Sequence, residues 1–596
     1  MSDTELPQAS LWYRITFSCL GTCSATLLFL LANYGAGLIS GSVTYASSYF
    51  LLLGTGLCFL CLERNSWKGD TIFCLSISMV AVALSLSGSF LWKDDAIPAS
   101  YQMALVLSMM VLFAIPAVYY QTARQNGCAK SKEILFPRYK SLFENAWSNK
   151  LLLLFAGLFL GTAWAILGLC GELFELISID FFSDLFTSEP FAYIFSGLTF
   201  GLGVSLARER PRIIQSLLQI VLTLFRFLAP LLGLVALLFI LTLAVMGPEK
   251  LWATGHATQL LLTLLFLFIL FENAVIQSGE DNQGFPGPVQ WLIMAVNVTL
   301  PAFALLALYA VWLRVEQYGW TPERFYMAVL AVIGLIYAIS YAVAVLTLWK
   351  NWTDRIIKAN PVIALLVLVF AVLIHLPPFE PYRLSLKDQI SRLEDGRIKP
   401  ADFDFSYLRF RLGTAGQKAL KDIENNPVLM ADPLIASRIE QVKKQSYYQA
   451  SADRDAPDYL SLGNFTDYLV LYPSTIEVPG DVNKALVENY QWVLSSCYQE
   501  QQPEARCLLV NLDLNQDSQK EFLLISQYNT AYSLMLQPDG SWKAGPQLTA
   551  GYNNGSSKEY QSALERGDFR LTAPTIQNLT IGDQLFQVEF PYILQE

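Results

Sequence analysis

The sequence is short of charge and of histidine. Only 15% of its 596 residues are charged, and its two histidines are His256 and His375. An average soluble domain carries about 25% charged residues. No Ser–His–Asp arrangement, phosphate-binding glycine loop or metalloprotease helix motif occurs. These absences leave no catalytic residue to name. They favour a non-enzymatic protein with no bound cofactor, apart from a calcium ion considered below.

Most of the net charge lies near the C-terminal end. Residues 378–596 hold 29 of the 50 acidic and 20 of the 40 basic residues, so 9 of the 10 net negative charges fall there. An acidic segment without a basic stripe argues against nucleic acid as a partner. Before about residue 377, apolar runs have the length that crosses a lipid bilayer as a helix. The sequence therefore predicts a polytopic α-helical membrane bundle, residues 1–377, with a C-terminal α+β soluble domain.

Eleven apolar runs are expected to cross the membrane. They lie at about 14–33, 43–62, 71–92, 101–120, 150–171, 190–207, 227–247, 256–277, 289–313, 325–349 and 360–377. Two further segments, 137–149 and 211–225, are expected to form interfacial helices. The first places its apolar residues on one helical face. The second belongs to an apolar stretch that is too long for one untilted crossing.

The placement of basic residues predicts the orientation of these spans. Loops 121–149, 208–212 and 350–359 are rich in lysine and arginine, whereas loop 172–189 has none. Because basic loops remain in the cytoplasm, we expect a cytoplasmic N-terminus. Eleven crossings then place the tail, residues 378–596, on the opposite side.

The predicted spans lack ionisable residues near their centres. The best polar candidate is Asn297, four residues before Pro301. Asn297 could satisfy backbone groups freed by the proline, which is the favoured interpretation, or line a substrate cavity at a broken helix. At the outer face, four residues could form a metal or proton site, although no spacing motif supports it: His256, His375, Glu172 and Glu175.

The tail combines helical and strand patterns. Residues 378–450 are expected to form a helical juxtamembrane segment, and 451–596 an α+β domain with an antiparallel sheet. Helices are predicted at 385–395, 413–425, 431–446 and 481–496, and strands at "CLLVNL", "EFLLIS", "AYSLML" and "QLFQVEF". The stretch "QPDGSW" (537–542) predicts a hairpin turn.

Two features of the tail concern metal and redox chemistry. One is a run of oxygen-bearing side chains at every second position, which resembles a calcium-binding loop: Asp513, Asn515, Asp517, Gln519 and Glu521. A plain polar hairpin is favoured over a calcium loop, because Ser518 stands where such loops usually have glycine. The other is the isolated pair Cys497 and Cys507, which could form a disulfide in an oxidising compartment.

The stretch "RVEQYGWTPERFY" (314–326) is predicted to join the ninth and tenth spans as a short outer turn. Gly319 suits a left-handed helix end, Thr321 an N-cap and Pro322 the first helical position. Turn chemistry does not explain the charge cluster Arg314, Glu316, Glu323 and Arg324. We expect these charges to dock the turn against loop 172–189 or against the tail.

Four stretches together resemble a bacterial multi-pass membrane family known as domain of unknown function 4153. They are "SLFENAWSNK", "ELISIDFFSDLFTSEPFAY", "RVEQYGWTPERFY" and "ADFDFSYLRFRLGTAGQKAL". The resemblance implies a bacterial cytoplasmic (inner) membrane protein, in which the orientation predicted from the basic loops places the tail in the periplasm. It brings no established activity or catalytic residue.

Three functions remain open at this point. The least favoured is an intramembrane or periplasmic enzyme, whose candidate residues would be His256, His375, Glu172 and Glu175. The favoured one is a non-enzymatic scaffold, sensor or assembly protein of the cell envelope that presents its periplasmic domain to a protein partner. The alternative is a transporter or flippase for a lipid-like or uncharged solute, with Asn297 at its site. A solid bundle core around Asn297 would count against the alternative.

Overall fold

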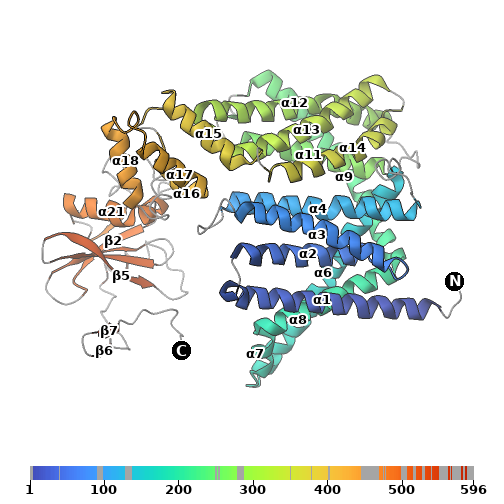
Figure 1. The fold of residues 1–596 in the computed structure, drawn as a ribbon, viewed down its shortest axis with the longest axis horizontal. Coiled ribbons are helices and arrows are strands. Elements are labelled where there is room, and N and C mark those ends of the chain that lie inside the picture. The colour runs from blue at the N-terminus through green and yellow to red at the C-terminus, as the bar shows by residue number, and fades with distance from the viewer. Residues whose placement is uncertain are drawn as a thin grey trace. The chain divides into compact units, whose positions relative to one another are not determined.

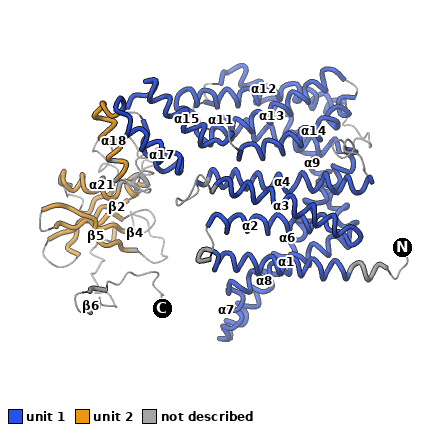
Figure 2. The backbone as a smooth tube through the Cα atoms, in the orientation of Figure 1, with its two compact units in different colours: residues 1–429 blue, residues 430–596 orange. Residues whose placement is uncertain are grey.

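The computed structural model divides the chain into two compact units, residues 1–429 and 430–596 (Figure 2). The first unit therefore includes about 50 residues beyond the last predicted span. The structure describes residues 5–38, 41–89, 98–127, 137–248, 251–252, 256–277, 287–348, 351–376, 379–400, 403–444, 469–473, 476, 478–497, 507–514, 519–525, 530–537, 540–549, 562–563, 566, 579–581 and 584–586.

Unit 1 is built from α-helices (Figure 1). They are α1 (Glu5–Leu38), α2 (Gly41–Cys61), α3 (Trp67–Ser89), α4 (Ala99–Gln125), α6 (Tyr139–Glu175), α7 (Phe181–Thr187), α8 (Glu189–Glu209), α9 (Pro211–Met246), α11 (Ala257–Ile276), α12 (Gly287–Tyr318), α13 (Pro322–Thr347), α14 (Trp352–Leu373), α15 (Pro381–Glu394), α16 (Phe405–Arg411) and α17 (Gly413–Glu424). Within the described ranges, eleven helices are long and apolar enough to cross a membrane, which confirms the predicted spans. The protein is an integral membrane protein.

Two of these helices include the segments that were predicted as interfacial helices. Segment 137–149 forms the first turns of α6, and segment 211–225 forms the first turns of α9. Neither is a separate interfacial helix, so that prediction is wrong. No helix-breaking residue separates either segment from its span, and α9 runs through Pro230 without interruption.

Small residues bring α1 and α8 into close contact. A Cβ atom on Gly201 would lie 2.2 Å from the carbonyl oxygen of Phe17, and one on Gly21 would lie 2.1 Å from that of Gly197. Helices without a hydrophobic driving force between them associate through such close backbone approach. A second, larger core lies among α9, α11, α12 and α13, where Leu265, Phe268 and Tyr341 are fully buried.

Unit 2 is an α+β domain, as expected. Its elements are α18 (Pro433–Lys444), β1 (Leu469–Tyr472), α21 (Gly480–Ser496), β2 (Cys507–Leu512), β3 (Glu521–Ile525), β4 (Thr530–Leu536), β5 (Trp542–Thr549), β6 (Leu579–Ile581) and β7 (Gln584–Phe586). One sheet has the order β1-β2-β3-β4-β5, and β6 pairs with β7. The β2–β5 pairings are antiparallel, whereas β1 pairs with β2 in parallel.

The helix α21 covers one face of the five-stranded sheet. Its residues Val482, Leu486 and Val493 are buried against the alternating residues Leu509 of β2 and Leu524 of β3. The parallel pairing of β1 and β2 follows from this helix, because parallel neighbours need a crossover connection between them.

Candidate functional site

A polar stripe on α15 contacts the turn between α12 and α13. Ser385, Asp388, Gln389 and Arg392 are spaced at i, i+3, i+4 and i+7, which places them on one helical face. We call these four residues the α15 clamp. Three of them are buried: Ser385, Gln389 and Arg392.

The α15 clamp caps the C-terminal end of α12. Arg392 donates hydrogen bonds from Nη1 to the Glu316 carbonyl (3.1 Å) and from Nη2 to the Val315 carbonyl (2.5 Å). Gln389 Nε2 donates to the Tyr318 carbonyl (3.1 Å). The last carbonyls of a helix have no partner within it and carry partial negative charge. A buried guanidinium is therefore well suited to this position.

Asp388 and Ser385 hold Trp320, the second residue after the end of α12. Asp388 Oδ2 accepts a hydrogen bond from the Trp320 amide (2.8 Å) and one from Arg392 Nε (3.2 Å). Ser385 Oγ donates to the Trp320 carbonyl (2.8 Å) and lies 3.0 Å from the Tyr407 hydroxyl of α16. The turn, α15 and α16 thus form one hydrogen-bonded assembly within unit 1.

Gly319 lies at the centre of this contact. Its φ is +78°, the left-handed conformation predicted for it. A Cβ atom here would lie 2.6 Å from Gln389 Nε2, 2.8 Å from Asp388 Oδ2 and 3.1 Å from Arg392 Nε. The glycine therefore serves both the chain reversal and the approach of the clamp.

The charges of the turn contribute less than expected. Arg324 Nη1 donates to the Gly319 carbonyl (2.6 Å), and its guanidinium lies over the Tyr318 ring. The side chains of Arg314, Glu316 and Glu323 are exposed. In the described part of the chain, none of these three side chains forms an ion pair with loop 172–189 or with the tail. The turn contacts the tail through its backbone instead.

His375 lies beside the same end of the bundle, just after α14. It is 3% exposed, its Nε2 lies 2.9 Å from Ser108 Oγ, and its ring packs edge-on against Tyr101. The imidazole is therefore a packed polar group.

Glu380 begins the clamp helix. Its Oε1 accepts a hydrogen bond from the Tyr382 amide (3.0 Å), as an N-cap does, and Arg383 Nε lies 3.3 Å from Oε2 without hydrogen-bond geometry. Burial raises the pKa of Glu380, and the Tyr382 amide and Arg383 offset this effect only in part.

The proposed site of His256, His375, Glu172 and Glu175 does not form. His256, Glu172 and Glu175 are exposed, while His375 is buried. Across the described ranges, no three His, Cys, Asp or Glu side chains are grouped so as to hold a metal ion. The sequence predicted that these residues lie at the same depth in the membrane, but residues at the same depth can belong to helices on different sides of the bundle.

Asn297 lies in a packed interior next to a residue that the sequence analysis passed over. It is 0% exposed, and its Nδ2 donates to Glu272 Oε1 of α11 (2.5 Å) and to the Ile293 carbonyl (3.1 Å). The carbonyl freed by Pro301 is that of Asn297 itself, so the side chain does not serve it. Glu272 could have been noticed as the single acid within the eighth apolar run.

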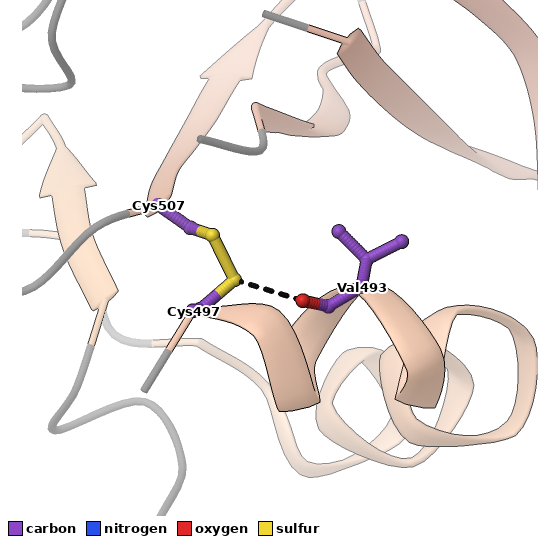
Figure 3. The surroundings of a disulfide bond; sticks show 3 residues. All are labelled: Val493, Cys497 and Cys507. Carbon is purple, nitrogen blue, oxygen red and sulfur yellow. Dashed lines mark hydrogen bonds between the residues drawn. A yellow bond between two sulfur atoms is a disulfide. The ribbon is translucent and has the colours of Figure 1, made fainter. Parts of the chain in front are cut away.

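In unit 2, Cys497 at the end of α21 and Cys507 at the start of β2 form a disulfide (Figure 3). Cys497 Sγ lies 3.1 Å from the Val493 carbonyl oxygen. The bond fastens the covering helix to the second strand of the sheet.

The proposed calcium loop is described in part. Asn515 and Asp517 lie outside the described residues. Glu521 is 4% exposed, and its Oε2 accepts a hydrogen bond from the Leu514 amide (2.7 Å). This contact joins the first residue of β3 to a residue just after β2. Calcium binding by the full predicted set stays a prediction: Asp513, Asn515, Asp517, Gln519 and Glu521.

Comparison with known proteins identifies the membrane unit. No curated protein and no solved structure shows a significant match to the chain. One family model matches residues 27–423, from α1 to the end of α17, and so includes the α15 clamp. Since the match covers well over half of the sequence, the chain belongs to the family described as domain of unknown function (DUF4153).

Proposed function

We propose that the membrane bundle is a platform that presents the C-terminal α+β domain to a partner protein on the periplasmic side of a bacterial cytoplasmic membrane. The α15 clamp carries this proposal. It makes the segment that follows the last span part of the membrane unit, so that the chain leaves the bundle from a fixed position. The extent of the family match, to residue 423, supports the same division.

The bundle interior around Asn297 also supports a platform. Asn297 is fully buried, and its neighbours Ile293, Val296 and Leu300 are 0–1% exposed. A transporter or flippase that used Asn297 would need it to line a cavity. The packed surroundings argue against a solute cavity at this part of α12.

The contribution of the clamp can be tested with Arg392→Ala in the full-length protein in lipid nanodiscs. Arg397→Ala is a matched control, because Arg397 is half exposed and pairs with Asp395 just after the same helix. Loss of the buried guanidinium should cost about 3 kcal/mol locally. Hydrogen exchange in residues 314–320 and 381–394 should therefore rise roughly 100-fold. Equal exchange in the two variants would contradict the clamp.

A lipid-transport assay distinguishes the platform function from a transporter or flippase function. The purified protein in liposomes should not accelerate the transfer of a fluorescent phospholipid between leaflets beyond the rate in protein-free liposomes. Acceleration that is lost in Asn297→Ala would overturn the proposal and favour a flippase.

The protein partner can be tested by photo-crosslinking from residues of unit 2 in intact cells. This should yield a discrete crosslinked product that Arg392→Ala weakens and Arg397→Ala does not.

A further inference from the structure

Glu272 is a buried acid without a cation. It lies in α11, four residues before the helix ends, and is 2% exposed. Oε1 accepts one hydrogen bond, from Asn297 Nδ2, whereas Oε2 has no hydrogen-bond partner. In the described part of the chain, no lysine, arginine or histidine forms an ion pair with this carboxyl group.

The orientation of Asn297 is fixed by its second contact. Because Nδ2 also donates to the Ile293 carbonyl, the amide cannot be turned over without placing two oxygens against each other. Asn297 Oδ1 then has no donor either. Two unpartnered oxygens, Glu272 Oε2 and Asn297 Oδ1, therefore belong to one hydrogen-bonded pair inside the bundle.

Asp70 shows how the same protein stabilises a buried carboxylate. Asp70 is 0% exposed and accepts hydrogen bonds from Arg124 Nη1 (2.9 Å), the Tyr120 hydroxyl (2.8 Å), Ser66 Oγ (2.8 Å) and the Glu63 amide (2.9 Å). A guanidinium and three further donors match a full negative charge. Glu272 has one neutral amide in their place.

This difference decides the charge of Glu272. An isolated carboxylate in an apolar interior costs several kcal/mol or more, and such a group takes up a proton instead. A neutral carboxyl group leaves one O–H unpaired, which costs only about 1–3 kcal/mol. A proton on Oε2 is therefore the less costly state.

A chain of polar groups leads from this region to an end of the bundle. Asn273 Nδ2 donates to the Tyr341 hydroxyl (2.7 Å), which donates to Asn360 Oδ1 (2.9 Å), and Asn360 Nδ2 lies 3.3 Å from the Tyr139 hydroxyl. Asn273, where this chain begins, directly follows Glu272 in α11. Tyr139 is half buried at the first residue of α6.

We propose that Glu272 and Asn297 form a proton-binding site inside the membrane domain, and that the proton exchanges with water through the groups of Asn273, Tyr341, Asn360 and Tyr139. In the forward step a hydronium ion at the Tyr139 end loses a proton: one of its O–H bonds breaks, an O–H bond to Glu272 Oε2 forms, the carboxylate becomes a carboxylic acid, and water remains. Along the route the Tyr139 and Tyr341 hydroxyl groups each accept one proton and release another, and the reverse step runs through the same bonds. Tyr341 from α13 and Tyr139 from α6 are the titratable groups of this polar chain.

The occupant can be identified in the wild-type protein with a hydrophobic carbodiimide, which modifies protonated carboxyl groups in apolar surroundings. Mass spectrometry of the full-length protein in liposomes should find Glu272 modified at least about tenfold faster than Asp70. Unmodified Glu272, or equal modification of both, would overturn the proposal. Protection of Glu272 by sodium ions at constant pH would show that sodium, and not a proton, is the ligand.

Exchange through the polar chain has its own readout. The infrared carbonyl band of a protonated acid should be present in the wild-type protein, absent in Glu272→Gln, and shifted on transfer to heavy water. Tyr341→Phe should slow that shift. Tyr337→Phe is the control, because Tyr337 packs edge-on against Tyr341 on the same helix. No band assignable to Glu272 would refute the site, and equal shift rates in the two tyrosine variants would refute the route.

Discussion

Gly319 shows how one residue can be required for two reasons. Its φ of +78° disfavours any side chain, and the clamp residues fill the space that a Cβ atom would occupy. Gly396, two residues after the end of α15, has a similar φ of +69°, but nothing lies within 4 Å of its Cβ position. The two glycines therefore separate the cost of the backbone conformation from the cost of the contact.

We predict that Gly319→Ala destabilises the protein more than Gly396→Ala does. Each substitution should cost about 1 kcal/mol through φ alone. Gly319→Ala should cost about 1–3 kcal/mol more, because Gln389, Asp388 and Arg392 must move. Thermal unfolding of the full-length protein in detergent should therefore give a lower melting temperature for Gly319→Ala. Equal melting temperatures would mean that the clamp residues move aside for the added methyl group at no cost in stability, which would contradict the prediction.

Local chemistry made part of this turn predictable. Gly319, Thr321 and Pro322 occupy the positions that their backbone preferences indicate, and Thr321 accepts the Arg324 amide as an N-cap. Arg392 could not be assigned in this way, because its partner Val315 is 77 residues away in sequence. A polar stripe on a predicted helix does not reveal which backbone it will cap.

The helix pair α1–α8 depends on the absence of side chains. Gly197 and Gly201 are spaced four residues apart on α8 and meet Gly21 and Phe17 of α1 at backbone distance. Ser205, one turn further, donates from Oγ to the Tyr13 carbonyl (3.1 Å). Such a row of small residues lets two membrane helices approach closely.

We predict that Gly201→Ala weakens this pair. The added Cβ would lie 2.2 Å from the Phe17 carbonyl oxygen, which belongs to the backbone and cannot rotate away. Gly161→Ala on α6 is the control, because nothing lies within 4 Å of its Cβ position. Removing a glycine from an open helix position should stabilise by about 0.5–1 kcal/mol. The melting temperature should fall for Gly201→Ala and hold or rise for Gly161→Ala. A fall of equal size in both would contradict the packing argument.

Element types were more predictable than their limits. All eleven spans follow from the lengths of their apolar runs, and the tail helices α15, α17, α18 and α21 follow from helical patterns; both are local properties. The continuity of α6 and α9 was missed, because the amphipathic pattern of a surface helix also suits the first turns of a longer one. The parallel strand β1 was missed because its pairing depends on the crossover through α21.

The two units together raise the question of orientation. Basic residues in alternate loops predict that unit 2 lies outside the cytoplasm, and the Cys497–Cys507 disulfide suits an oxidising compartment. These two arguments are independent, since the first rests on lysine and arginine in unit 1 and the second on cysteines in unit 2. Agreement between their tests would therefore carry more weight than either test alone.

We predict that alkaline phosphatase fused after residue 318 or 450 is active, and that a fusion after residue 209 is inactive, because the enzyme folds only outside the cytoplasm. In the same cells, denaturing thiol labelling should modify seven of the nine cysteines without reduction and all nine after it, since two are held in the disulfide. Cys497→Ser with Cys507→Ser should abolish the difference between labelling without and with reduction.

An active fusion after residue 209, together with nine reactive thiols before reduction, would place unit 2 in the cytoplasm. That result would reverse the bundle and remove the periplasmic partner from the proposed function. The α15 clamp would remain, because its contacts are independent of which side of the membrane they face.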